Sequence, residues 1–487
     1  MAQVRRLAAG AACALLLAGC GSSSAPGPPH GGPTLRLALP AMPRTLDPAK
    51  AADLPSLNVA HELYAGLTRF SGRGVEPDLA DSWARSEGGL VWTFHLRKGL
   101  RWSDDRPIRA QDFRAAWLHA LDPKTGSAYA QAEMGNIRGA RPYHATGRGD
   151  VGVEAVDDRT LRVTLEHPVP WLDQQVAWPV FFPRPATPHT FSGPFRLASR
   201  SGARLVLERN FNYWDAAAVK PSRLVLTTST KRVDAVLPRN VAPPGFHWVP
   251  TATAPAGWKP LPTLARGLLW LVTRGTPLAD PNARAFVYRS VPQLTPRPGP
   301  LVPPAMPGAA TVNAGFPRLR DFTTAPPGPL TLAYTDQDAG GAQLADRIRS
   351  RLGQEGVQVT LEPVPTLTQL VRLAGPPAQP GIDLVLLGWS SEYFDAYNLL
   401  DLFPCGSAFN VARWCDPSYD KLMRRTVRTL DDRARWRLER RLAAMVEDAV
   451  PAIPLYSPQE HVLLNHRVVG FRWSPIGFYE LMGMTRS

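Results

Sequence analysis

Two neighbouring side chains in the last quarter of the sequence have the chemistry of a ligand site. Trp389 and Glu392 follow the apolar run Leu384–Leu387. An indole wall beside a carboxylate suits a ligand that carries a cationic amine next to apolar groups. A core tryptophan followed by a solvated loop charge would give the same spacing, so spacing alone leaves both interpretations open.

Other chemistry-bearing patterns are weak. Nucleophile elbows, HExxH, Walker loops and glycine-rich dinucleotide fingerprints do not occur in a supporting context. His61 beside Glu62, and His461 near His466, could be metal ligands, but such histidines are more often ordinary surface or helix residues. We therefore expect no enzyme activity, no metal and no cofactor.

The first twenty residues indicate export. Arg5 and Arg6 precede the apolar run Leu7–Leu17, which is too short to cross a bilayer, so residues 1–19 are predicted to be a signal peptide. The segment Leu17–Cys20 resembles a bacterial lipoprotein lipobox. The resemblance implies a diacylglyceryl group on Cys20 and attachment to the extracytoplasmic face of the cell membrane. A plain secretory signal with a chance cysteine is the alternative.

Two further cysteines, Cys405 and Cys415, lie in the exported part with nine residues between them. We expect a disulfide, because exported chains meet oxidising conditions. Two free thiols or a metal pair are the alternatives, although neither a CxxC spacing nor a nearby histidine pair supports zinc.

Length and composition set the outline. The chain has 487 residues, which suits two or three domains, and 44% of them are apolar, which excludes wholesale disorder. The 39 Gly and 51 Pro favour many turns over a helical bundle. The formal net charge is +14. We find no basic run interleaved with aromatic residues, so a membrane or cell-wall polymer is a better neighbour than nucleic acid.

Hydrophobic periodicity predicts a mixed fold. Residues 20–33 read as a flexible tether. The first half then alternates between apolar and polar residues in several short runs, which predicts antiparallel strands, with helices between them. The expected strands are 35–39, 90–97, 161–165 and 204–208, and the expected helices are 58–67 and 110–121.

The second half has the order βαβαβ. Strands are expected at 330–334, 357–361 and 382–387, with helices at 342–352 and 367–373. The apolar run Leu384–Leu387 is typical of a strand buried on both faces of a parallel sheet. Ligands bind beyond the carboxyl ends of such strands, so residues 388–395 are expected at a cleft. Two more helices are expected after Asp416 and around Leu442. Between 236 and 329 the sequence is rich in proline, and only one strand is predicted there, at 267–273.

Four ordered segments carry a resemblance to a known family. They resemble the peptide-binding class of bacterial extracellular solute-binding proteins, the receptors of ABC importers for oligopeptides and dipeptides. The matching stretches are Thr45–Pro48 with Glu62–Leu67, Val75–Ser127, Leu207–Trp214 and Gly388–Tyr456.

The resemblance implies a mixed α/β and α+β, two-lobe periplasmic-binding-protein-like fold with a hinge and an extra domain on the first lobe. The domains it implies are lobe I at 34–75, 182–265 and 458–487, the extra domain at 76–181, and lobe II at 266–457. It places Glu392 where the family has an aspartate that pairs with the α-ammonium group of a peptide. Ligand-binding positions are then Gly388, Trp389, Glu392, Tyr393, Asp395, Tyr129 and Asn58.

Two departures from the family matter. Glu392 replaces the family's aspartate, which moves the carboxylate outward by one methylene. The family's helix after residue 280 is followed here by a run of prolines, so the second lobe is expected to be shortened.

The function implied is a monomeric, lipid-anchored receptor that captures peptides or peptide-like solutes for ABC permease and ATPase subunits. A non-transporting sensor, scaffold or chaperone-like lipoprotein with a degenerate ligand site is the alternative. Closure of the two lobes would require a hinge near residues 265 and 458.

Overall fold

The structure is a computed structural model that describes residues 31–487 except 73, 186, 188, 240–255, 292–299, 310–326, 336–338 and 375–380. The lipid-attachment prediction for Cys20 and the signal peptide lie outside the described residues. In the part that is described, no helix is both long and apolar enough to cross a membrane.

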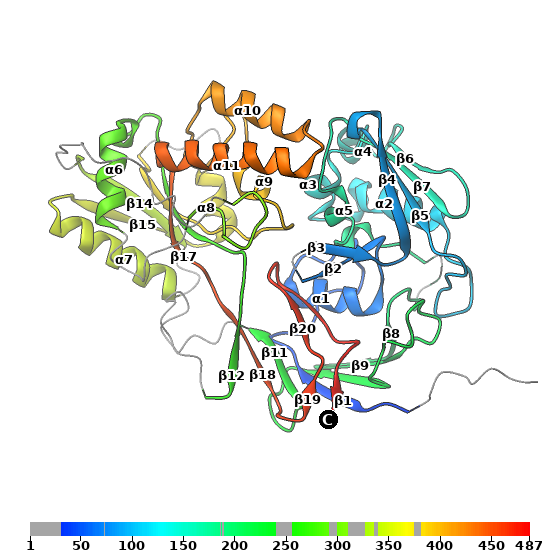
Figure 1. The fold of residues 1–487 in the computed structure, drawn as a ribbon. Coiled ribbons are helices and arrows are strands. Elements are labelled where there is room, and N and C mark those ends of the chain that lie inside the picture. The colour runs from blue at the N-terminus through cyan, green and yellow to red at the C-terminus, as the bar shows by residue number, and fades with distance from the viewer. Residues whose placement is uncertain are drawn as a thin grey trace, which may run out of the picture.

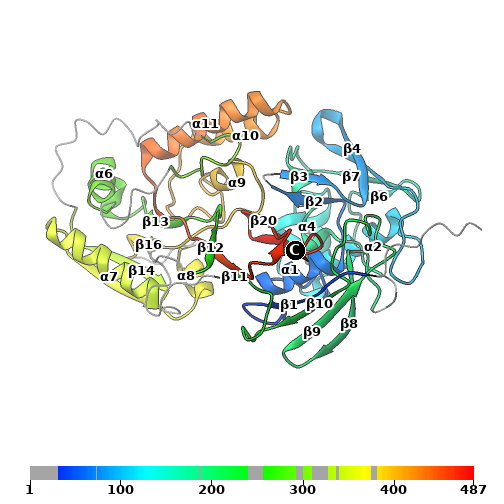
Figure 2. The ribbon, with the colours of Figure 1, turned by 60° about the horizontal axis from the view of Figure 1, so that its bottom comes forward.

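Two lobes stand side by side, each built on its own large sheet (Figures 1 and 2). The first lobe holds a seven-stranded sheet with the order β12-β18-β11-β1-β10-β9-β8. Its strands are β1 (Thr34–Ala38), β8 (Phe195–Ser201), β9 (Arg204–Arg209), β10 (Arg223–Thr227), β11 (Ala235–Arg239), β12 (Trp258–Leu261) and β18 (Glu460–Leu464).

Helix α1 (Leu54–Leu63) and three two-stranded antiparallel sheets complete this lobe. The sheets are β2 (Thr68–Ser71) with β3 (Gly74–Pro77), β19 (Val468–Val469) with β22 (Thr485–Arg486), and β20 (Arg472–Ser474) with β21 (Phe478–Glu480). Helix α1 begins and ends about four residues earlier than predicted. Asp53 caps its start by accepting a hydrogen bond from the backbone N–H of Ser56 at 3.0 Å, and Pro55 fits the first turn.

The extra domain has a four-stranded antiparallel sheet in the order β4-β5-β7-β6. The predicted strand at 90–97 is its central strand β5, and helix α2 has the predicted bounds. The elements are β4 (Ala80–Ser86), β5 (Val91–Leu96), β6 (Val153–Ala155), β7 (Thr160–Thr164), α2 (Ala110–Leu121), α3 (Ala130–Met134), α4 (Ala140–Thr146) and α5 (Leu172–Gln175).

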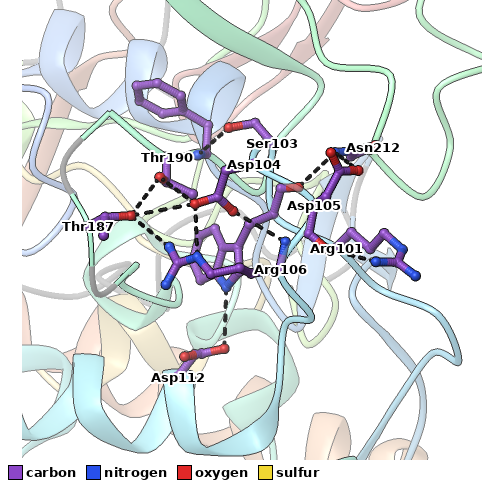
Figure 3. A network of polar contacts seen from close by, with 11 residues as sticks. Arg101, Ser103, Asp104, Asp105, Arg106, Asp112, Thr187, Thr190 and Asn212 are labelled. Atoms are coloured by element: carbon purple, nitrogen blue, oxygen red, sulfur yellow. Dashed lines mark hydrogen bonds and ion pairs between the residues drawn. The ribbon is translucent and has the colours of Figure 1, made fainter.

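A polar network ties this domain to the first lobe (Figure 3). Asp104 accepts hydrogen bonds from Arg106 Nε at 2.8 Å and from Thr190 Oγ1 at 3.2 Å. Asn212 donates to Asp105 at 3.1 Å. The charged side chains Asp104 and Arg106 stay exposed, whereas Thr190 is buried, so the network links the loop at 101–106 to Thr190 without burying charge.

The second lobe holds a five-stranded mixed sheet in the order β15-β14-β16-β13-β17. As predicted, β14 is parallel to both β15 and β16, and β16 is fully buried. On the other side, β13 is antiparallel to β16 and β17. The strands are β13 (Gly267–Leu271), β14 (Leu330–Thr335), β15 (Val359–Val364), β16 (Leu384–Leu386) and β17 (Ala452–Tyr456).

The helices of this lobe are α6 (Pro281–Ser290), α7 (Ala339–Gln354), α8 (Leu367–Ala374), α9 (Tyr397–Leu400), α10 (Pro417–Val427) and α11 (Asp432–Ala449). The sequence predicted a single strand between 236 and 329. The structure also has β11, β12 and α6 in this region, which were not predicted. Helix α6 forms despite Pro281 because proline at the first position has no N–H to lose, and Asp280 accepts from the N–H of Asn282 at 2.9 Å.

The chain crosses between the lobes twice, from β12 to β13 and from β17 to β18 (Figure 1). The two crossings touch: Arg266 donates to Ser457 Oγ at 2.5 Å, and Thr263 donates to the Pro458 carbonyl at 2.5 Å. A Cβ on Gly267 would lie 2.0 Å from the ring of Tyr456, so only glycine permits this approach. The contact coincides with the hinge positions expected from the sequence.

Candidate ligand-binding site

A cavity of about 330 Å³ lies between the two lobes, and we call it the interlobe cavity. One wall comes from the extra domain, between residues 132 and 175, and the other from the second lobe, between residues 389 and 427. The helices that supply these walls, α3 and α5 on one side and α9 on the other, face each other in Figure 1. The predicted residues Trp389, Glu392 and Tyr393 line this cavity.

Asn398 positions the two residues that the sequence singled out. Its Nδ2 donates to Glu392 Oε2 at 2.6 Å, and its Oδ1 accepts from Trp389 Nε1 at 3.1 Å. Trp389 is also held by backbone hydrogen bonds in both directions with Arg266, each 2.8 Å, and its ring contacts Phe409 edge-on. The indole and the carboxyl are therefore fixed relative to each other and to the hinge.

Burial dominates the electrostatics of Glu392. Desolvation raises the pKa of its carboxyl to about 7, although the hydrogen bond from Asn398 opposes that shift. No ion pair reaches this carboxyl among the described residues. A buried acid without a resident cation is costly to ionise, and a ligand cation would remove that cost.

Glu133 faces the same cavity from α3 and was not predicted. Its pKa is raised to about 8, first by desolvation and then by the charge of Glu392. Gln175 donates to Glu133 Oε2 at 3.4 Å. Glu133 and Glu392 line the same cavity although they come from different lobes. A lone glutamate on a five-residue helix carries no sequence signal for such a neighbour.

Two direct hydrogen bonds join the walls. Trp178 Nε1 donates to the Glu392 carbonyl at 2.7 Å, and the Phe394 N–H donates to Gln174 Oε1 at 2.7 Å. Tyr129 packs its ring 5.6 Å from that of Trp178, and burial raises the pKa of its phenol, with Glu392 and Glu133 adding to the shift. Tyr129, a ligand-binding position implied by the family resemblance, does not line the cavity, and its role there stays a prediction.

Asp395 is buried but lies outside the cavity lining. Its carboxylate forms an ion pair with Arg435 of α11, and Arg435 also binds Glu439 at 2.7 Å. The guanidinium lies 5.7 Å from the ring centre of Trp171, which stacks on Tyr393 at 5.3 Å. Asp395 thus positions Arg435, which packs against the aromatic wall of the cavity.

The remaining predicted residues have structural surroundings. Asn58 joins α1 to the C-terminal hairpin: it donates to the carbonyls of Leu54 and Gly477 and accepts from the N–H of Tyr479. It does not line the interlobe cavity. Gly388 follows β16 and lies against the crossing, where a Cβ would be 2.9 Å from the Arg266 carbonyl.

Cys405 and Cys415 are joined in a disulfide, as the sequence favoured. The loop that it closes carries Phe409, which lines the cavity. The disulfide therefore restrains an aromatic part of the wall.

A second cavity of about 300 Å³ lies wholly in the first lobe. It is lined by His61, whose pKa burial lowers to about 3, and by the buried Glu62. His61 packs against the rings of Phe182 and Phe478. His61 therefore lies on helix α1 among aromatic rings, where burial favours its neutral form.

Comparisons with known proteins find similarity to bacterial solute-binding proteins. Residues 74–285 match the family model described as bacterial extracellular solute-binding proteins, family 5 middle. The chain is 28% identical to the probable deoxycholate-binding periplasmic protein YgiS of Escherichia coli K12, over 88% of this chain and 89% of YgiS. It is 27% identical to the oligopeptide-binding protein OppA of Bacillus subtilis 168, over 87% of each chain.

The fold is also found among solved structures. The unliganded open form of MppA, a periplasmic murein tripeptide binding protein, matches with a TM-score of 0.77 and 22% identity, over 93% of this chain and 97% of MppA. That likeness shows the two-lobe fold that the sequence predicted.

Proposed function

We propose that the chain, which resembles the peptide-binding class of bacterial extracellular solute-binding proteins, captures peptides or peptide-like solutes and delivers them to an ABC importer. The ligand would lie between the lobes, and rotation at the Arg266–Ser457 contact would enclose it. A lipid on Cys20 would hold the protein at the extracytoplasmic face, which raises its concentration near the permease.

The observation that carries this proposal is Glu392. Its carboxyl is half-buried between the lobes, is positioned by Asn398 and has no cation within ion-pair distance among the described residues. The α-ammonium group of a peptide supplies the missing cation. Hydrogen bonds to a charged group contribute about 1.5 to 3 kcal/mol, enough to fix one end of an extended chain while main-chain contacts hold the rest.

The name of the relative YgiS raises another class of ligand, an anionic steroid. The interlobe cavity opposes it here, because Glu133, Glu392 and Asp401 line that cavity while Arg141 is its lone described cation besides the weakly basic His167. A ligand carboxylate would meet net repulsion in this site.

The proposal is tested by identifying what the protein carries. The full chain, purified from rich medium in mild detergent, is examined by mass spectrometry under native and then denaturing conditions, alongside Glu392→Ala. We expect a released peptide that is absent or strongly reduced in the variant. An empty site in both proteins, without a thermal shift from peptide mixtures, would favour the sensor or scaffold alternative, and a released steroid acid would contradict the peptide assignment.

A further inference from the structure

The interlobe cavity holds more acceptor groups than one ammonium group uses. Besides Glu392 it presents Glu133, and the two carboxyls come from opposite walls. Glu133 is buried and Glu392 is half-buried, and neither takes part in an ion pair among the described residues. The hydrogen bond from Asn398 serves Glu392, and the long one from Gln175 serves Glu133.

Gln175 supplies an independent sign that a donor is missing. Its side chain is 5% exposed and lines the cavity, and its Nε2 is turned to Glu133. Its Oε1 is buried and has no hydrogen-bond partner. An unsatisfied buried carbonyl costs about 1 to 3 kcal/mol. Two carboxyls and one free amide oxygen therefore face a space in which N–H donors would satisfy all three.

The other charged and titratable groups of the cavity do not fill this role. Arg141 of α4 donates its Nε to the Gly135 carbonyl at 3.1 Å and is not within ion-pair distance of either glutamate. Asp401 accepts from the Tyr397 hydroxyl at 3.1 Å and adds a third acid. The remaining titratable groups beside the pair are His167, Tyr129 and Tyr393, and burial lowers the pKa of His167, which favours its neutral form.

We propose that Glu133 and Glu392 form a two-carboxyl site for a ligand with two ammonium groups, best matched by a peptide whose first residue has a basic side chain. The α-ammonium group would bind Glu392, and the side-chain ammonium group would bind Glu133 and Gln175 Oε1. Glu133 is then the residue that sets a preference for a basic first residue. This inference rests on the proposed function and names the ligand class of the same site.

Occupancy by two cations would also change the protonation of the pair. Desolvation and mutual repulsion favour at least one proton on the empty pair near neutral pH. Two ammonium groups would favour both ionised carboxylates, so binding would release protons. The preference for a basic first residue should therefore be stronger at pH 7.5 than at pH 5.5, a dependence that a purely structural role of Glu133 would not produce.

The experiment is calorimetric titration of the ligand-free full chain with Xaa-Ala-Ala peptides. Xaa is alanine, diaminopropionate, diaminobutyrate, ornithine or lysine, and 1,4-diaminobutane is titrated in parallel. The variants are Glu133→Gln, Glu392→Gln and the matched control Glu154→Gln, an exposed glutamate on β6 that pairs with Arg162 at 3.2 Å. All proteins are measured at pH 7.5 and 5.5.

We expect at least one basic peptide to bind wild type about tenfold more tightly than Ala-Ala-Ala at pH 7.5. Glu133→Gln should reduce that ratio to within about twofold. Glu154→Gln should behave as wild type. A wild-type ratio near one, or a ratio that survives in Glu133→Gln, would overturn the inference while leaving the proposed function standing.

Other outcomes separate the two claims. If 1,4-diaminobutane binds more tightly than every peptide and loses affinity in Glu133→Gln, the two-carboxyl site is supported and the peptide assignment is overturned. If no peptide and no diamine binds wild type, both claims are overturned.

Discussion

Glu392 and Asp395 lie in one loop of the second lobe, Asp395 buried and Glu392 half-buried, and their carboxyls have opposite surroundings. Asp395 pairs with Arg435, which also binds Glu439. Glu392 has only the amide of Asn398 and, across the cavity, another acid, Glu133. The comparison teaches how to separate structural acids from ligand-binding acids. A buried carboxyl with a resident cation supports the fold, whereas one without it can take its cation from a ligand.

The largest loss of stability should come from removing Arg435, the cation that pairs with Asp395. Arg435→Met would leave Asp395 and Glu439 buried without their partner and should destabilise the protein by about 3 to 5 kcal/mol. Thermal melting checks this, with Arg437→Met on the exposed side of α11 as the control. A melting temperature equal to that of the control would remove the distinction between the two acidic groups.

A smaller loss is expected from opening the loop that carries Phe409. Replacing Cys405 and Cys415 together by serine should cost about 2 to 3 kcal/mol, because the unfolded chain regains the freedom that the disulfide removes. A reducing agent should lower the melting temperature of wild type toward that of the double variant and leave the variant unchanged. Equal melting of both proteins under oxidising conditions would show that the wall is ordered without the disulfide.

The pH dependence of stability tests the ligand-binding pair itself. Folding raises the pKa of Glu133 from its ordinary 4.5 to about 8, so the native state binds the proton more tightly than the unfolded state. The stability that this proton provides is present below pH 4.5 and is lost as the pH rises toward 8. Ligand-free wild type should therefore melt lower at pH 8.5 than at pH 5.

Glu133→Gln should flatten that slope and melt about 2 °C or more above wild type at pH 8.5, an effect on the order of 1 kcal/mol. Glu154→Gln serves as the control and should follow wild type. Parallel melting curves for wild type and Glu133→Gln across the pH range would show that Glu133 is not a buried acid of the kind described.

The smallest effect is expected at an exposed acid that has more partners than Glu392. Asp104 accepts from Arg106 and Thr190 but is only partly covered (Figure 3). Asp104→Asn should change stability by no more than about 1 kcal/mol in a urea titration. A larger loss would mean that the number of hydrogen-bond partners, rather than burial, decides how much a carboxyl contributes to the free energy of unfolding of this protein.

The sequence predicted the fold class and Trp389 and Glu392 as neighbours in a cleft, because a buried parallel strand ends just before them. Local patterns also predicted α2 and β5 closely. The sequence did not predict Glu133 as a site residue, because Glu392 lies on the other lobe and only the tertiary fold brings both to one cavity. For the same reason the sequence did not predict that Arg435 pairs with Asp395. Arg435 is one of 48 arginines, and nothing in its local sequence marks it as buried.

The most direct test of the central claim, that Glu392 binds the α-ammonium group of a peptide, is a titration with Ala-Ala-Ala and with its N-acetylated form at pH 7. Acetylation removes the cation and keeps the rest of the peptide. We predict that wild type binds the free peptide at least about tenfold more tightly than the acetylated one, and that Glu392→Gln binds both alike. Equal affinity of wild type for the two peptides, or a difference that persists in Glu392→Gln, would contradict the account.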